Sequence, residues 1–227
     1  MKKQKFNQVN TGVEKVDGLG LALGQGRFTD DYSFPGMLHG KLLRSPHAHA
    51  RIKKIETKKA EALPGVAAVF THQDVPRIAI TTAGQGFPEP SPYDEFILDN
   101  KVRFVGDKVA LVAAETAEIA EEALKLIEVE YEVLPAVLDP RKSMRSSSPV
   151  IHDEKDCEIV IPVPYEPEKN RVARVDAVVG DIKRGVAEAE MTVEDEFENQ
   201  TASHSAMEPH CSISRLDENG RLEIIST

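Results

Sequence analysis

The sequence predicts an α+β fold, because patterns typical of helices and of strands both occur within its 227 residues. Residues 116–127 carry one apolar stripe at helical spacing, which predicts an amphipathic helix. The stripe consists of Ile119, Ala120, Ala123, Leu124 and Ile127. Over residues 127–133, apolar side chains then alternate with glutamates, which predicts a half-buried strand. Asn219 and Gly220, between two apolar runs, predict a β-hairpin.

The glycine-rich residues 18–26 follow a polar arm, residues 1–17, and are predicted to form a turn-rich entry segment. They resemble a dinucleotide-binding loop only superficially. The G-x-G-x-x-G spacing fails by one residue, no strand pattern precedes it and no helical pattern follows. The sequence therefore argues against a nucleotide site here.

Short apolar runs predict the remaining strands of the first half. They are residues 37–45, 50–56, 66–70, 102–105 and 109–113. The last run is apolar at every position, as expected for a strand covered on both faces. Thr57 is predicted to cap a short helix over residues 58–63, which Pro64 and Gly65 end. Residues 79–93 are rich in glycine and proline and are predicted to form a long loop, a place where functional residues are often found.

Residues 136–170 contain prolines and a serine run but few apolar clusters, so a linker is predicted there. Beyond it, the patterns predict strands over residues 173–179 and 191–198 and, between them, a helix over residues 182–189 that Asp181 caps. The hairpin strands are predicted at residues 211–216 and 221–226. Ile224 and Ile225 are expected to form an exposed apolar edge that favours association.

The composition is that of a soluble globular protein, and we expect a cytoplasmic location. No apolar run approaches the roughly 20 residues that span a bilayer, and no apolar stretch follows the basic N-terminus as in a secretory signal. A net charge of -10 argues against a nucleic-acid surface. Cys157 and Cys211 are too few for an all-cysteine metal site and are predicted to be unpaired thiols.

Residues 200–211 bring together the side chains most suited to chemistry, which are Gln200, His204, Glu208, His210 and Cys211. His204 and Glu208 would share a face of a helix, but Pro209 disfavours one, whereas Glu208 and His210 would share a face of a strand. Zinc sites usually have more regular ligand spacing. The pattern favours a polar structural cluster, and a small metalloprotein remains an alternative.

The second histidine pair, His47 and His49, would point the same way in an extended segment, but no third ligand lies nearby in the sequence. We therefore expect turn or surface histidines. The sequence contains no nucleophile elbow and no phosphate-binding loop. Cys211 lies next to His210, but the sequence shows no third group that would orient such a pair. Composition and spacing alone therefore identify no catalytic residue.

Several blocks together are similar to a known family. Residues 26–32, 35–52, 62–70 and 105–110 resemble, in this order, the start of the molybdenum-binding subunit of the xanthine dehydrogenase and aldehyde oxidase family. The residues from Thr81 to Gly84 and from Ile97 to Asp107 resemble its xanthine dehydrogenase-like branch most. The resemblance implies an α/β-hammerhead domain over residues 18–135 and, over residues 171–227, the first strands of a molybdopterin-binding domain.

The resemblance also implies a function. The parent enzyme would hydroxylate a purine such as xanthine or hypoxanthine, with water as the oxygen source and electrons passing through 2Fe–2S clusters and FAD to NAD. Its cofactor would be molybdenum-molybdopterin or molybdopterin cytosine dinucleotide. The expected partners are the remainder of the molybdenum subunit, an iron–sulfur subunit and an FAD subunit, with no nucleic acid and no membrane.

The same resemblance limits what this chain is expected to do alone. In the family, the strand similar to residues 222–227 leads into the first residue beside the molybdenum, so we expect an incomplete molybdopterin-binding domain. Gln200, His204 and Glu208 are candidates for the wall of the cofactor pocket, and no residue is assigned as catalytic or as a metal ligand. We therefore expect the chain alone to bind no cofactor and to be inactive. The alternative is a non-catalytic assembly module built on the hammerhead fold.

Overall fold

The computed structural model describes residues 12–82, 92–159, 165–174, 176–207 and 210–226. These residues fall into two compact units. The first unit is Gly36–Val193, and the second combines Met1–Pro35 with Glu194–Thr227. Among the described helices, none is both long enough and apolar enough to cross a membrane.

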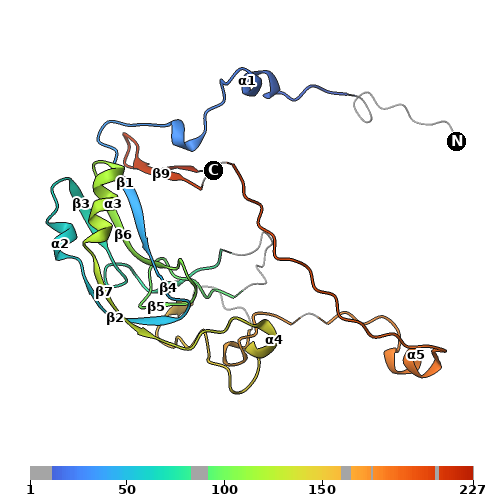
Figure 1. Cartoon of the computed structure of the whole chain (residues 1–227). Coiled ribbons are helices and arrows are strands. Elements are labelled where there is room, and N and C mark those ends of the chain that lie inside the picture. Colours follow the sequence, from blue (N-terminus) through green and yellow to red (C-terminus); the bar gives the residue numbers. More distant parts are fainter. Residues whose placement is uncertain (1–11, 83–91, 160–164, 175, 208–209, 227) are drawn as a thin grey trace. The chain divides into compact units, whose positions relative to one another are not determined.

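The first sheet of the unit Gly36–Val193 has the order β1-β6-β3 (Figure 1). β1 (His39–Arg44) and β3 (Val66–Phe70) both pair antiparallel with the central strand β6 (Lys108–Ala114). The strand predicted over residues 109–113 is thus confirmed. Val109, Ala110, Val112 and Ala114 of this strand are all fully buried, because neighbouring elements cover both of its faces.

The second sheet has the order β5-β2-β7. β2 (Ala50–Glu56) pairs antiparallel with the short β5 (Lys101–Val102) and with β7 (Glu128–Val133). The alternation predicted for β7 is largely confirmed, since Val129 and Tyr131 are half-buried while Glu128, Glu130 and Glu132 are exposed. The exposed Val133 at the end of the strand departs from it.

Two helices accompany the first sheet, the short α2 (Lys58–Glu61) and the amphipathic α3 (Ala117–Lys125). The hydroxyl of Thr116 caps α3 by accepting a hydrogen bond from the backbone N–H of Ile119 at 3.2 Å. Ala120 and Ala123 on its apolar stripe are fully buried and share a core cluster with Val112 of β6. Thr57 lies at the N-cap of α2 as predicted, but its hydroxyl donates to Glu61 instead of capping the helix.

Gly65 lies at the turn between α2 and β3 and has a φ of 87°, a backbone conformation that favours glycine. A Cβ atom there would lie 2.7 Å from Cδ1 of Ile119, which packs against the core from α3. We expect Gly65→Ala to lower the free energy of unfolding by about 1 to 2 kcal/mol, because the left-handed φ is strained and the end of the Ile119 side chain must shift. Urea denaturation followed by circular dichroism measures this change.

Gly106→Ala is the matched control for that substitution. Gly106 has a φ of 94°, yet no atom lies within 4 Å of the position where its Cβ would be. This variant should therefore lose only about 1 kcal/mol, the cost of the left-handed backbone alone. A larger loss for Gly65→Ala would show that the shift of Ile119 carries a cost, and equal losses would show that it carries none.

Residues 136–170 carry short elements where the sequence predicts only a linker. These are α4 (Pro140–Ser143), β8 (Glu158–Ile159) and the 3-10 turn η2 (Pro167–Lys169). β8 pairs in parallel with β4 (Ile78–Ala79). The predicted loop over residues 79–93 lies partly outside the described residues, and an antiparallel bridge between Ile80 and Glu95 joins its two sides. Domain boundaries near residues 135 and 170 stay a prediction.

Two predicted strands are wrong, and only Val102 of a third, residues 102–105, lies in a strand. Residues 173–179 and 191–198, where described, have no strand partner and are mostly exposed. Their apolar residues resemble strand patterns, but a strand forms only where a neighbouring strand completes its hydrogen bonds. The helix predicted between them is confirmed as α5 (Ile182–Glu188), with the Asp181 side chain accepting from the backbone N–H of Arg184 at 3.0 Å.

The second unit contains α1 (Gly18–Ala22), the 3-10 turn η1 (Thr29–Asp31), and the antiparallel strands β9 (Ser212–Leu216) and β10 (Leu222–Ser226). The hairpin prediction is confirmed, and Gly220 has the positive φ of 75° that this turn requires. The entry segment, predicted as turns, includes the one helical stretch α1. The guanidinium of Arg215 on β9 lies 4.1 Å from the ring centre of Phe34.

Candidate functional site

The described pocket-wall candidates, Gln200 and His204, lie in a stretch without regular structure. Gln200, His204 and His210 are exposed, and Glu208 lies outside the described residues. Within the described part of the chain, no three histidine, cysteine, aspartate or glutamate side chains come together in a way that could hold a metal ion. Among the described residues, the structure therefore shows no cluster that joins the candidates of this stretch, and their role as a pocket wall stays a prediction.

Cys211 is half-buried and interacts with Asp30 of η1. A hydrogen bond with the Asp30 carboxylate, followed by burial, raises the pKa of the Cys211 thiol. A nucleophilic cysteine needs the opposite shift, because the thiolate is the reactive form. The environment of this thiol thus suits a structural role.

His47 and His49 each make a contact that supports the fold. The ring of His47 contacts Tyr131 edge-on, with ring centres 4.9 Å apart. His49 is buried, which corrects the prediction of a turn or surface residue, and its Nδ1 lies 2.7 Å from the carbonyl oxygen of Pro135. Burial lowers the pKa of His49, so the neutral ring ties β2 to the chain that follows β7.

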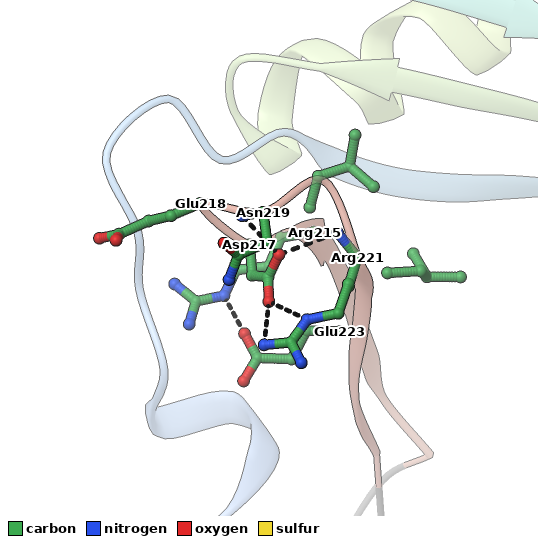
Figure 2. A pocket seen from close by; sticks show the side chains of 8 residues that line it. Arg215, Asp217, Glu218, Asn219, Arg221 and Glu223 are labelled. Atoms are coloured by element: carbon green, nitrogen blue, oxygen red, sulfur yellow. Dashed lines mark hydrogen bonds and ion pairs between the residues drawn. The ribbon is translucent and has the colours of Figure 1, made fainter.

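A shallow pocket of about 640 Å³ lies at the tip of the hairpin (Figure 2). Four of its five charged side chains form two pairs, Arg221 with Asp217 and Arg215 with Glu223. The carboxylate of Asp217 accepts from the backbone N–H groups of Asn219 and Arg221, at 2.9 and 2.8 Å, and from Nε of Arg221 at 2.7 Å. Arg215 pairs with Glu223 across the strands. These contacts stabilise the turn, and they leave this pocket few groups for a ligand.

A nearly buried cluster of charged groups lies instead in the unit Gly36–Val193, around Arg103 just after β5. Its guanidinium contacts the carboxylates of Asp99, at 2.8 Å, and of Glu154. All three side chains are nearly buried, with exposed fractions of 9%, 6% and 7%. Arg77 also donates to Asp99, at 2.9 Å. Buried charges of this kind persist only when they are paired.

Phe96 forms the apolar side of this cluster. Its ring is 5% exposed, and the guanidinium groups of Arg77 and Arg103 lie 5.1 and 5.5 Å from the ring centre. Arginine stacks on aromatic rings in this way because its guanidinium is planar and weakly hydrated. Phe96 thereby contributes to the positions of the two cations that share Asp99.

His152 lies between two carboxylates at the edge of the same cluster. Its Nδ1 is 3.4 Å from Oε1 of Glu154, and its Nε2 is 3.9 Å from Oδ2 of Asp94. Burial, together with the positive charges of Arg103 and Lys101, lowers the pKa of His152 to about 4. The ring is therefore neutral at pH 7. Burial also raises the pKa of Asp94.

A cavity of about 210 Å³ adjoins this cluster. Its lining residues are Asp94, Glu95, Phe96, Asp99, Arg103, Phe104, Asp107, Lys108 and His152. Asp99 and Arg103 already pair with each other. The carboxylate of Asp107 accepts hydrogen bonds from the backbone N–H groups of Arg103 and Lys108. The arrangement suits the stabilisation of a loop junction better than acid–base chemistry on a ligand.

Sequence reasoning missed this cluster because its members come from separate parts of the chain. The available signal was the run of charged residues at 152–156, which stands out within the proline- and serine-rich segment predicted as a linker. Its partners, Arg77 and Arg103, lie 79 and 51 residues from Asp156 and Glu154, and no local pattern reveals that pairing.

Comparison with known proteins places these features in context. The family model described as "Aldehyde oxidase and xanthine dehydrogenase, a/b hammerhead domain" matches residues 23–135. The model described as "Molybdopterin cofactor-binding domain" matches residues 165–227. The two matches follow one another along the chain, and the charged run at 152–156 lies in the interval between them.

Curated relatives and solved structures agree with these matches. The chain is 41% identical over 200 residues to the probable hypoxanthine oxidase XdhD of Escherichia coli O157:H7, covering 78% of this chain and 21% of that protein. It is 35% identical over 206 residues to a probable xanthine dehydrogenase subunit from Bacillus subtilis, covering 91% and 25%. It is similar to the structure of quinoline 2-oxidoreductase from Pseudomonas putida 86, with a TM-score of 0.75, 30% identity, and coverage of 95% and 26%. The chain thus spans about a fifth to a quarter of these relatives.

Proposed function

The chain belongs to the xanthine dehydrogenase and aldehyde oxidase family, where it corresponds to the N-terminal part of the molybdenum-binding subunit. We propose that it serves in the oxidative hydroxylation of a purine. The proposed substrate class rests on sequence identity to two relatives. The chain is 41% identical to a probable hypoxanthine oxidase and 35% identical to a probable xanthine dehydrogenase subunit. Xanthine and hypoxanthine are the substrates we propose.

The proposed reaction takes its oxygen from water and sends electrons through 2Fe–2S clusters and FAD to NAD. The molybdenum cofactor, as molybdopterin or its cytosine dinucleotide, would supply the redox chemistry when bound. The described residues of this chain do not form a closed site for it, since Gln200 and His204 are exposed. We therefore derive no catalytic step from them, and we expect the chain alone to hold no molybdenum.

The role that we propose for this chain is to supply the hammerhead domain and the first part of the cofactor domain. The unit Gly36–Val193 has its own apolar core and two three-stranded sheets, so it can position the residues that follow. In contrast, apolar side chains along the second matched region are strongly exposed. They include Val178, Val179, Ile182, Val186, Met191, Val193, Phe197 and Met207.

Such exposure supports a partner surface. Val179, Phe197 and Met207 are 97%, 86% and 99% exposed, and large exposed apolar side chains that recur along one region are typical of an interaction site. The remainder of a molybdenum subunit, together with iron–sulfur and FAD subunits, would provide the covering surfaces. These partners are part of the proposal.

An exchange experiment tests this role. The 206 aligned residues of the Bacillus subtilis protein are replaced by the corresponding residues of this chain, and xanthine oxidation is measured in the assembled enzyme. The matched control is the same exchange in the nicotinate dehydrogenase large molybdopterin subunit of Eubacterium barkeri, to which the chain is 32% identical over 214 residues. The two recipient proteins have nearly equal sequence identity to this chain, 35% and 32%, so overall similarity does not decide which chimera stays active.

We expect the xanthine dehydrogenase chimera to remain active and the nicotinate dehydrogenase chimera to lose most of its activity. An active nicotinate dehydrogenase chimera beside an inactive xanthine dehydrogenase chimera would contradict the assignment of a purine substrate. It would still agree with a chain that supplies the hammerhead domain and the first part of the cofactor domain. Two soluble chimeras that both lack activity and molybdenum would instead favour a non-catalytic assembly module.

A further inference from the structure

The segment after α4 carries three acidic residues that meet basic residues of the hammerhead sheets and loops. Asp153 pairs with Arg51 of β2 and with Lys101 of β5, and Glu154 pairs with Arg103. Asp156 pairs with Arg77, which precedes β4. The acidic partners thus come from one stretch of four residues, and the basic partners come from three separate parts of the domain. We call residues 151–159 the latch segment.

Lys101 is the most deeply buried member of these pairs. Its side chain is 1% exposed, and its Nζ donates to the carbonyl oxygen of Ile151 at 2.6 Å and to Oδ1 of Asp153 at 2.7 Å. Burial lowers the pKa of Lys101. Burial alone would raise the pKa of Asp153, but the hydrogen bond from Lys101 and the charges of Lys101 and Arg51 hold it below its ordinary value. The buried ammonium depends on the latch segment for both of its partners.

Backbone contacts fix the two ends of the latch segment. The N–H of Ile151 donates to Oδ1 of Asn170 at 2.9 Å, and the Nδ2 of Asn170 donates to the carbonyl oxygens of Ser143 and Pro149, also at 2.9 Å. At the other end, β8 pairs with β4, and the N–H of Glu158 donates to the carbonyl oxygen of Arg77 at 3.1 Å. These amide groups report whether the segment is attached.

The apolar core of the domain does not include the latch segment. Both core clusters take all their members from residues 43–131. No residue of 151–159 is fully buried, although their acidic groups reach nearly buried cations. The segment is therefore attached by ion pairs and hydrogen bonds, and it can detach without opening a cavity in the core.

We propose that residues 151–159 form an electrostatic latch that opens and closes as one unit on an otherwise folded hammerhead domain. When closed, the latch fixes the place where the chain leaves the domain on its way to the region that matches the molybdopterin-binding domain. When open, it releases this exit, while both sheets and α3 stay intact. This inference does not depend on the proposed reaction.

Hydrogen exchange of the full chain, measured by NMR, tests the latch. Asp153→Asn removes the charge that Lys101 and Arg51 share but keeps an oxygen that can accept a hydrogen bond. We expect the amides of Ile151 and Glu158 to exchange about 10- to 100-fold faster in this variant, because a buried cation loses its charged partner. The amide of Val112 in β6 should exchange at the same rate as before.

Glu128→Gln is the matched control, because it removes a carboxylate from the pair of Lys59 and Glu128, both of which are about two-thirds exposed. It should leave the exchange of Ile151 and Glu158 unchanged. If Asp153→Asn does not fold, Asp156→Asn serves in its place, since it leaves Lys101 paired. The latch is refuted if the latch amides are unaffected, or if they and Val112 accelerate together, because the segment would then open only with the whole domain.

Discussion

Replacing Arg103 by methionine is expected to lower the free energy of unfolding of the hammerhead unit by about 3 to 5 kcal/mol. The substitution keeps most of the side-chain volume but removes the cation that Asp99 and Glu154 share. Both carboxylates are nearly buried, and removing one partner of a buried ion pair leaves an uncompensated charge. Asp99 keeps Arg77 as a partner, so Glu154 accounts for most of the expected loss. Urea denaturation at pH 7 measures the change.

Two further variants show whether the loss comes from the unpaired charge. Lys59→Met removes a surface ion pair with Glu128 and should lose less than about 1 kcal/mol. The double variant Arg103→Met with Glu154→Gln should recover part of the loss, because the unpaired carboxylate is gone. A loss of under about 1 kcal/mol in Arg103→Met would show that the pair contributes no more than an exposed one.

The second large effect is a dependence of stability on pH that His152 causes. In the folded protein the pKa of His152 is about 4, compared with 6.5 for a free histidine. Between these two values the unfolded chain binds more protons than the folded protein, so the free energy of unfolding falls as the pH falls. We expect the contribution of His152 to be fully present above about pH 6.5 and to shrink by about 2 to 3 kcal/mol as the pH approaches 4.

His152→Gln isolates this contribution, because glutamine is polar but does not titrate. The variant and the natural sequence should show nearly parallel stabilities above pH 7 and should diverge between pH 6.5 and 4.5, with the natural sequence losing more. The carboxylates near His152, Asp94 and Glu154, are present in both proteins and cancel in the difference. Identical pH profiles for the two proteins would mean that His152 titrates as in an unfolded chain.

The sequence was most informative where local patterns decide structure. Residues 50–56 and 66–70 were predicted as strands with the bounds of β2 and β3, because short apolar runs between turn residues determine both ends. The hairpin of β9 and β10 follows from Asn219 and Gly220 for the same reason. The two wrong strands, residues 173–179 and 191–198, have suitable residues but no partner strand among the described residues.

The sequence was least informative about contacts between distant residues. Arg51 and Asp153 are 102 residues apart and Lys101 and Asp153 are 52 apart, so neither pair leaves a periodic pattern. The segment that contains Asp153 reads as a linker because it has prolines, a serine run and few apolar clusters, yet ion pairs attach it to the domain. The predicted pocket wall of Gln200, His204 and Glu208 came from resemblance and not from spacing, and it stays a prediction.

Molybdenum content is the most direct test of the proposed role, because cofactor binding precedes turnover and does not depend on which substrate is used. The measurement is elemental analysis of the purified Bacillus subtilis protein in which this chain replaces the aligned 206 residues. We expect the same molybdenum content as in the unaltered protein. A soluble and folded chimera without molybdenum would contradict the proposed role, because the chain would then fail to support the cofactor domain of its own family.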